Sequence, residues 1–288
     1  MNYLNRGLHR TLNSIQKKKR LFIVIVLLQL IFVVSSLWLG THYVLRLLTD
    51  AQGVITPLEQ ANYNSQTIEQ GTPFTPDFLP IYNSYQSMLK NVIAFASWMA
   101  VLFLILNGSI WILSHNLFAE KKERKLDLKR NLPEKAKEAL QYFLKSWSAA
   151  IILFTPFAVA SYYILIHYIR LSDSFATVLF MLKIVLLVKA GLYYFLLVAF
   201  ATATELSWKK FASKIIQLSI FNFPKTFSLF VINAILLGSS FGALYAAVEY
   251  TESIMLLLLT GLLIIITIVL TRLFWIATLN EIERGTKI

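Results

Sequence analysis

Residues 254–279 read IMLLLLTGLLIIITIVLTRLFWIATL and contain one charged residue, Arg272. A helix of about 20 apolar residues is long enough to cross the roughly 30 Å hydrocarbon core of a bilayer. A helix that is apolar on every side also needs lipid or protein around it rather than water. We therefore expect residues 254–279 to form a membrane-spanning helix.

Five other stretches have the same character, and they are residues 21–45, 92–113, 148–169, 178–203 and 229–248. The whole chain of 288 residues is 57% hydrophobic and 15% charged. A soluble domain is roughly half apolar and about a quarter charged, because it needs a polar surface that faces water. This chain has too few charged residues for such a surface. The sequence predicts an all-α integral membrane protein with about six transmembrane helices. The first apolar run is too long for a signal peptide, so we expect it to be retained as an anchor.

The distribution of basic residues predicts the orientation of these helices. Most of the 27 Lys and Arg residues lie in residues 1–20, 119–147 and 207–227 and in the C-terminal tail. Only Arg46, Lys90 and Arg170 fall on the other side of the expected spans. Because basic residues stay on the cytoplasmic side, we expect a multi-pass protein of the cell (inner or plasma) membrane with both termini in the cytoplasm. Anionic lipid headgroups then account for the net charge of +12, and no nucleic acid is expected as a partner.

Basic amphipathic segments precede three of the spans and suggest an internal repeat. They lie in residues 1–20, in residues 119–147, where Lys145 is on the polar side, and in residues 207–227. A basic amphipathic helix is suited to lie in the headgroup plane with its apolar face toward the acyl chains. We expect three parallel repeats, each an interfacial helix followed by a transmembrane hairpin. The alternative is that any basic linker beside a span looks amphipathic.

This interpretation divides the chain into an alternation of interfacial segments and hairpins. The expected parts are a basic arm (1–20), a first hairpin (21–118), a basic connection with an interfacial helix (119–147), a second hairpin (148–206), an interfacial helix (207–227), and a third hairpin with the tail (228–288). The first hairpin contains a long outer loop, 49–89, which is rich in Pro, Asn, Gln and Ser. Long loops are often functional, so this one is a candidate contact for a membrane or extracytoplasmic protein partner.

Charged residues inside spans are costly and are therefore candidate functional residues. Lys189 is the sharpest candidate, because it falls near the middle of the fourth span. Lys183 lies about two turns nearer the outer face and roughly 120° away around the helix. Glu249, at the outer end of the fifth span, could meet Lys183 at a similar depth.

Three further residues complete the candidate set. Arg272 lies about two turns from the inner end of the sixth span, and Glu205, at the inner end of the fourth, is its expected counterion. Asn233 is a polar residue within the fifth span. Such residues either tie helices together or line a cationic path for an anionic solute or a lipid headgroup.

The sequence contains none of the common catalytic signatures. It has no Cys, so thiolate metal sites and thiol nucleophiles are excluded, and it has no HExxH, P-loop, GxGxxG or GxSxG motif. No Asp lies inside a span. We expect no enzyme activity, cofactor or metal, and interpret the chain as a structural, accessory or scaffold module of the membrane. The alternative is a transporter, channel or lipid-binding protein that uses Lys189 in a midplane cavity to bind an anionic solute.

Overall fold

The computed structural model describes residues 3–60, 78–118, 132–171, 175–204, 207–250 and 253–286. Every regular element within these ranges is helical. The chain divides into two compact units, Leu30–Asn107 on the one hand and Met1–Gln29 with Gly108–Ile288 on the other. We call them the small unit and the large unit.

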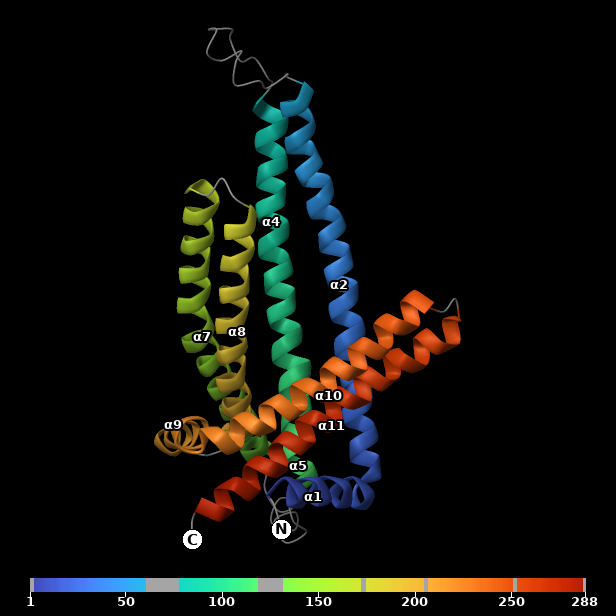
Figure 1. Ribbon diagram of the computed structural model, residues 1–288, viewed down its shortest axis with the longest axis vertical. Helices are drawn as coiled ribbons and strands as arrows, with labels where there is room; N and C mark the ends of the chain where they lie inside the picture. Colours follow the sequence, from blue (N-terminus) through green and yellow to red (C-terminus); the bar gives the residue numbers. More distant parts are fainter. Residues whose placement is uncertain are drawn as a thin grey trace. The chain divides into compact units, whose positions relative to one another are not determined.

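The small unit is a helical hairpin. It consists of α2 (Lys19–Gln60) from Leu30 onward, α4 (Phe78–Leu102) and a five-residue π-helix, Phe103–Asn107. Asn91 donates a hydrogen bond of 2.7 Å from Nδ2 to Asp50 Oδ2, and the Tyr43 ring lies 5.7 Å from that of Phe95. These contacts join the two long helices along their length (Figure 1).

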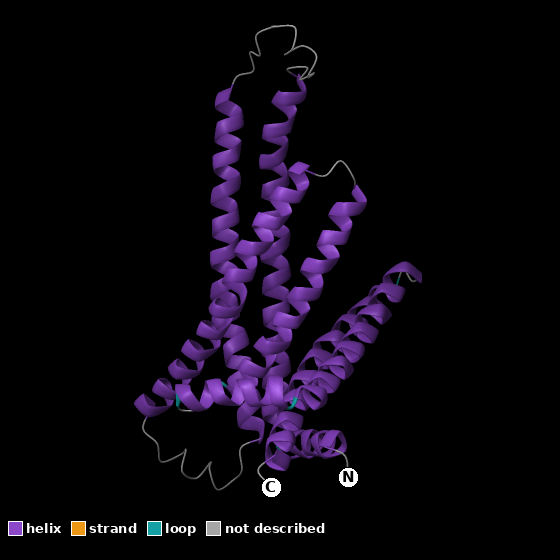
Figure 2. Ribbon diagram, turned by 60° about the vertical axis from the view of Figure 1, so that its left-hand side comes forward, coloured by secondary structure: helices purple, strands orange, loops and turns teal. Residues whose placement is uncertain are grey.

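The large unit contains the remaining helices. They are α1 (Tyr3–Lys17), the start of α2, α5 (Gly108–Phe118), α7 (Leu132–Leu171), α8 (Phe175–Thr202), α9 (Trp208–Ile216), a π-helix (Gln217–Phe221), α10 (Phe223–Tyr250) and α11 (Ile254–Thr286). α10 and α11 form one antiparallel hairpin, α7 and α8 form another, and α1 packs against α11 (Figures 1 and 2).

Six helices in the described ranges are long and apolar enough to cross a membrane, which confirms the number expected. Their limits are Lys19–Pro57, Phe78–Phe118, Leu140–Ser161, Leu179–Thr202, Phe223–Tyr250 and Ile254–Gly285. Several are longer than the apolar runs that predict them. α2 continues to Gln60 and α4 begins at Phe78, so both enter the expected outer loop 49–89, whose residues 61–77 lie outside the described ranges. A helix satisfies its own backbone, so it does not have to end where the apolar residues end.

Two of the three expected interfacial helices are separate helices, α1 and α9. The third differs from expectation. From Leu132 onward, the segment expected at 119–147 continues without a break into the following span as part of α7. Lys145, expected on the polar side of that segment, is only 1% exposed, while Leu140 and Leu144 are exposed. Packing of α7 on its neighbours, rather than its amphipathic pattern, decides which face is covered.

Buried residues of the large unit concentrate in particular parts of the helices. The second half of α8 is largely buried from Tyr194 onward, and α11 becomes buried from Ile264 to Ile282. The first half of α8 (residues 179–193) and the start of α11 expose apolar side chains. One cluster of buried residues, which includes Trp275, therefore joins the second half of α8 to residues of α5, α7 and α11.

Candidate functional site

The lysines of the fourth span are on the surface of the large unit. Lys189 and Lys183 are both exposed on α8, and Glu249 is exposed on α10. Among the described residues, no ion pair joins Lys183 to Glu249. These residues therefore face outward from the large unit.

The surroundings of Lys189 are apolar. It lies near the middle of the membrane-length part of α8, Leu179–Thr202. Leu186 and Leu187, within one turn of it, are strongly exposed, and the Leu187 side chain is 77% exposed. Lys189 is more than two helical turns from either end of this membrane-length segment.

Arg272 has a different environment from Lys189. Its guanidinium carbon lies 5.2 Å from the ring centroid of Trp111, which is within cation–π range. The expected counterion Glu205 lies outside the described residues. The Arg272 guanidinium lies against an aromatic ring of α5, and cation–π contacts are stronger where water is excluded.

Residues of α5, α7 and α8 converge near this pair. The Tyr142 hydroxyl of α7 donates to the carbonyl oxygen of Phe200 in α8 at 3.2 Å, and His115 Nε2 of α5 lies 3.4 Å from the same oxygen. Phe200 is in the last turn of α8, where carbonyl groups have no partner within the helix. Side chains of α5 and α7 thus contact a carbonyl group in the last turn of α8.

Two more hydrogen bonds join the membrane-length helices. Trp275 Nε1 in α11 donates to the carbonyl oxygen of Leu197 in α8 at 3.2 Å. The buried Asn233 of α10 donates from Nδ2 to the carbonyl oxygen of Thr271 at 3.4 Å. The contact of Asn233 is one that ties two helices together.

Lys145 has an aromatic environment of its own. Its Nζ lies 5.7 Å from the ring centroid of Trp208 and 5.9 Å from that of Phe211, both in α9. These rings are part of the apolar stripe expected for the interfacial helix in 207–227. The buried lysine of one expected interfacial segment therefore packs against the aromatic face of the next.

A second cluster joins α1 and α9 to the end of α11. A Cβ added at Gly7 would collide with Thr278, so α1 and α11 approach closely at that point. Arg10 forms an ion pair with Glu281 at 3.1 Å, and Lys214 forms one with Glu283 at 3.0 Å. Two acidic side chains that lie two residues apart in α11 thus form ion pairs with two amphipathic helices, α1 and α9.

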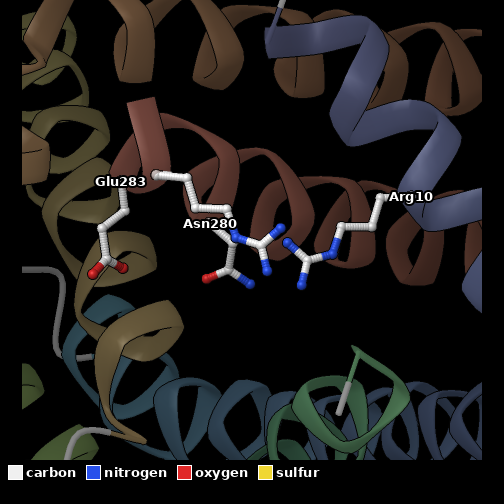
Figure 3. Close-up of a pocket in the computed structure, with 4 residues that line it drawn as sticks. Arg10, Asn280 and Glu283 are labelled. Atoms are coloured by element: carbon white, nitrogen blue, oxygen red, sulfur yellow. The ribbon is translucent and has the colours of Figure 1, made fainter. Parts of the chain in front are cut away.

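A cavity of about 260 Å³ lies beside this cluster (Figure 3). It is lined by Arg10 of α1 and by Asn280, Glu283 and Arg284 of α11. Arg10 extends from α1 toward Asn280 in the close-up. No group of three or more His, Asp or Glu residues in the described ranges is arranged to hold a metal ion.

Sequence patterns did not reveal several of these residues. Trp111, Tyr142 and Trp275 read as ordinary apolar positions, and Lys145 reads as a solvated lysine. Their roles depend on contacts between helices that are distant in the chain. A partial signal exists for Gly7, because a small residue between the leucines of an amphipathic helix often marks a close approach.

The described part of the chain is thus all-helical, with six helices of membrane length. Its large unit has a core rich in aromatic residues, and ion pairs at the end of α11. Comparison with models of protein families, with curated proteins and with solved structures finds no match.

Proposed function

We propose that this protein is a non-enzymatic accessory or scaffold subunit of a membrane, and that α8 pairs within the bilayer with a partner helix that carries a carboxylate. The observation that supports this proposal is the exposed Lys189 in the middle of an apolar span. A lysine at the centre of a bilayer costs about 3 kcal/mol for insertion, and more if it must stay charged in hydrocarbon. An acidic partner removes that cost.

The partner is expected to be a different protein rather than a second copy. No Asp or Glu of this chain lies in the middle of an expected span. Glu249 and Glu205 are at opposite ends of their spans. A second copy therefore has no carboxylate at the depth of Lys189, whereas a heterologous span with a mid-membrane Asp or Glu has one.

The proposed topology is six membrane spans with both termini in the cytoplasm, arranged as three parallel repeats. It is supported by the packing of α1 on the C-terminal part of α11, which brings the two ends of the chain to the same side. It is also supported by α1 and α9, two amphipathic helices that pair with neighbouring acids of α11. The basic surface on that side suits anionic headgroups. The expected outer segment 49–89, which includes the end of α2 and the start of α4, is proposed to contact an extracytoplasmic partner.

The decisive experiment is photo-crosslinking from α8 in native membranes. Benzoylphenylalanine at Tyr193, which is exposed and lies four residues from Lys189 on the same side of α8, should crosslink to a span that contains Asp or Glu. The crosslink should be lost with Lys189→Leu and retained with Lys189→Arg. Lys183→Leu is the matched control, because Lys183 is also exposed on α8 but points in another direction.

A charge exchange then tests the chemistry of the contact. Lys189→Asp should abolish the crosslink, and replacing the partner's acid by Lys should restore it. An unchanged crosslink in Lys189→Leu would refute the proposal.

The transporter alternative has its own test, which the absence of Cys makes simple. Lys189→Cys in a bilayer should resist a charged, membrane-impermeant thiol reagent if α8 faces a partner helix. Rapid labelling from either side would mean that water reaches this depth, and it would favour the alternative of a path for an anionic solute.

A further inference from the structure

The cavity between α1 and α11 has an excess of positive charge. Arg10 Nη1 and Arg284 Nη1 lie 3.1 Å and 3.4 Å from the same atom, Glu281 Oε1. The acid that lines the cavity, Glu283, is paired with Lys214. Three cationic side chains, Arg10, Arg284 and Lys214, thus meet two carboxylates, Glu281 and Glu283, beside the cavity.

The two guanidinium groups have more N–H donors than the Glu281 carboxylate can accept hydrogen bonds from. Each guanidinium carries five N–H donors in a planar fork, and such a fork matches the oxygens of a phosphate group. Asn280 adds an amide to the same lining. The Arg10 guanidinium is also held 5.9 Å above the Phe118 ring, which restricts its orientation. A cation is a poor occupant here, because two arginines repel it.

The apolar surface of α1 indicates where such a phosphate comes from. Leu8 and Leu12 are exposed on α1, while Gly7 and Thr11 of the same helix are buried. An amphipathic helix in this arrangement lies at the boundary of headgroups and acyl chains. The cavity is then at headgroup depth, with lipid beside it.

We infer that the cavity lined by Arg10, Asn280 and Arg284 binds a phosphate group, supplied by the headgroup of an anionic phospholipid. This site is independent of the pairing of α8 proposed above, and it requires only that α1 lies at the membrane surface. Variants of Lys189 should leave it intact, so the two proposals fail separately.

The test is lipid retention by the purified full-length chain. Native mass spectrometry of the detergent-solubilised protein would measure bound phosphatidic acid against phosphatidylcholine. Arg284→Gln should lower the affinity for phosphatidic acid roughly tenfold, as expected for one lost charge-assisted contact. Asn280→Asp keeps the shape of the side chain and adds a negative charge, so it should lower the affinity at least as much.

Matched controls keep the outcome interpretable. The Arg284 side chain is 62% exposed, so its substitution should leave the fold intact, which thermal unfolding would verify. Lys209→Gln removes an exposed charge of α9 that does not line the cavity, and it should change the affinity less than about twofold. Equal retention by the parent, Arg284→Gln and Asn280→Asp would overturn the inference.

Competition with inorganic phosphate separates the two sources of the group. In nanodiscs of phosphatidylcholine that contain phosphatidic acid, millimolar phosphate should displace little of the lipid. If phosphate alone binds the protein in pure phosphatidylcholine as tightly as the lipid does, and Arg284→Gln abolishes that binding, the phosphate site stands and the lipid source is wrong.

Discussion

The two halves of α8 have similar apolar sequences and opposite surroundings. In the first half, residues 179–193, most side chains are exposed, including Lys189. In the second half, from Tyr194 to Thr202, the chain packs against α5, α7 and α11. Hydrophobicity cannot separate them, because lipid is as good a solvent for leucine as a protein core is.

Specific packing and hydrogen bonds make the difference. In the second half, the carbonyl of Leu197 accepts a hydrogen bond from a tryptophan N–H and that of Phe200 accepts one from a tyrosine hydroxyl, and the small residue Ala199 is buried. The first half has large exposed leucines and no comparable recorded bond among the described residues. Membrane helices associate where small residues and polar groups allow close approach, and elsewhere they leave a face for lipid or for another protein.

The largest expected effect comes from the buried half. Trp275→Ala removes a side chain that is 1% exposed and its hydrogen bond to Leu197. Truncation of a buried aromatic residue costs about 3–5 kcal/mol of the free energy of unfolding. Unfolding in mixed detergent–SDS micelles would measure it. Leu187→Ala in the exposed half should cost about 0.5 kcal/mol or less. Equal losses in the two variants would show that both halves are packed.

The next effect tests the close approach of α1 to α11. Gly7→Ala places a Cβ against Thr278 and should cost about 1–3 kcal/mol, with faster hydrogen exchange in α1. Gly191→Ala is the control in the exposed half, because no atom lies within 4 Å of its added Cβ. It should be neutral or slightly stabilising, since Ala favours a helix over Gly. Thr278→Ala should partly rescue Gly7→Ala, and a lack of any rescue would argue against this contact.

A smaller effect is expected from the ion pairs at the end of α11. Glu281→Gln removes the partner of Arg10 and Arg284, and because the Glu281 side chain is only 11% exposed it should cost about 1 kcal/mol. Thermal unfolding and hydrogen exchange of α1 would measure the loss, and high salt should reduce the difference from the parent. Glu249→Gln at the exposed end of α10 should have no effect. An α1 that stays equally protected would mean that these pairs contribute nothing.

The smallest effect is expected from the lysines of the exposed half. Lys189→Leu and Lys183→Leu should each change the free energy of unfolding of the purified, isolated chain by about 0.5 kcal/mol or less, because neither contacts the core. The same micelle unfolding assay applies. A destabilisation of more than about 1 kcal/mol in Lys189→Leu alone would assign Lys189 a role within this chain instead of with a partner.

The amino-acid sequence by itself determined the helical class and the number of membrane-length helices. Hydrophobicity is a local property of each apolar run, and a helix forms its backbone hydrogen bonds within that same run. It also singled out Asn233 and Arg272 as unusual residues within spans. The contacts of these two residues could not be predicted from the sequence pattern, because they join helices that are distant in the chain. Arg272 meets the ring of Trp111, and Asn233 meets a carbonyl of the neighbouring helix.

Only the tertiary structure decided which apolar faces are covered. Lys145 is predicted on the polar side of its segment and is buried against Trp208, whereas Leu187, an apolar residue of the fourth span, is exposed. The physical reason lies in the proposed membrane setting: water is absent from a bilayer core, so polarity does not sort side chains into inside and outside there. Shape, small residues and hydrogen bonds sort them instead, and these act only between helices that the fold has brought together.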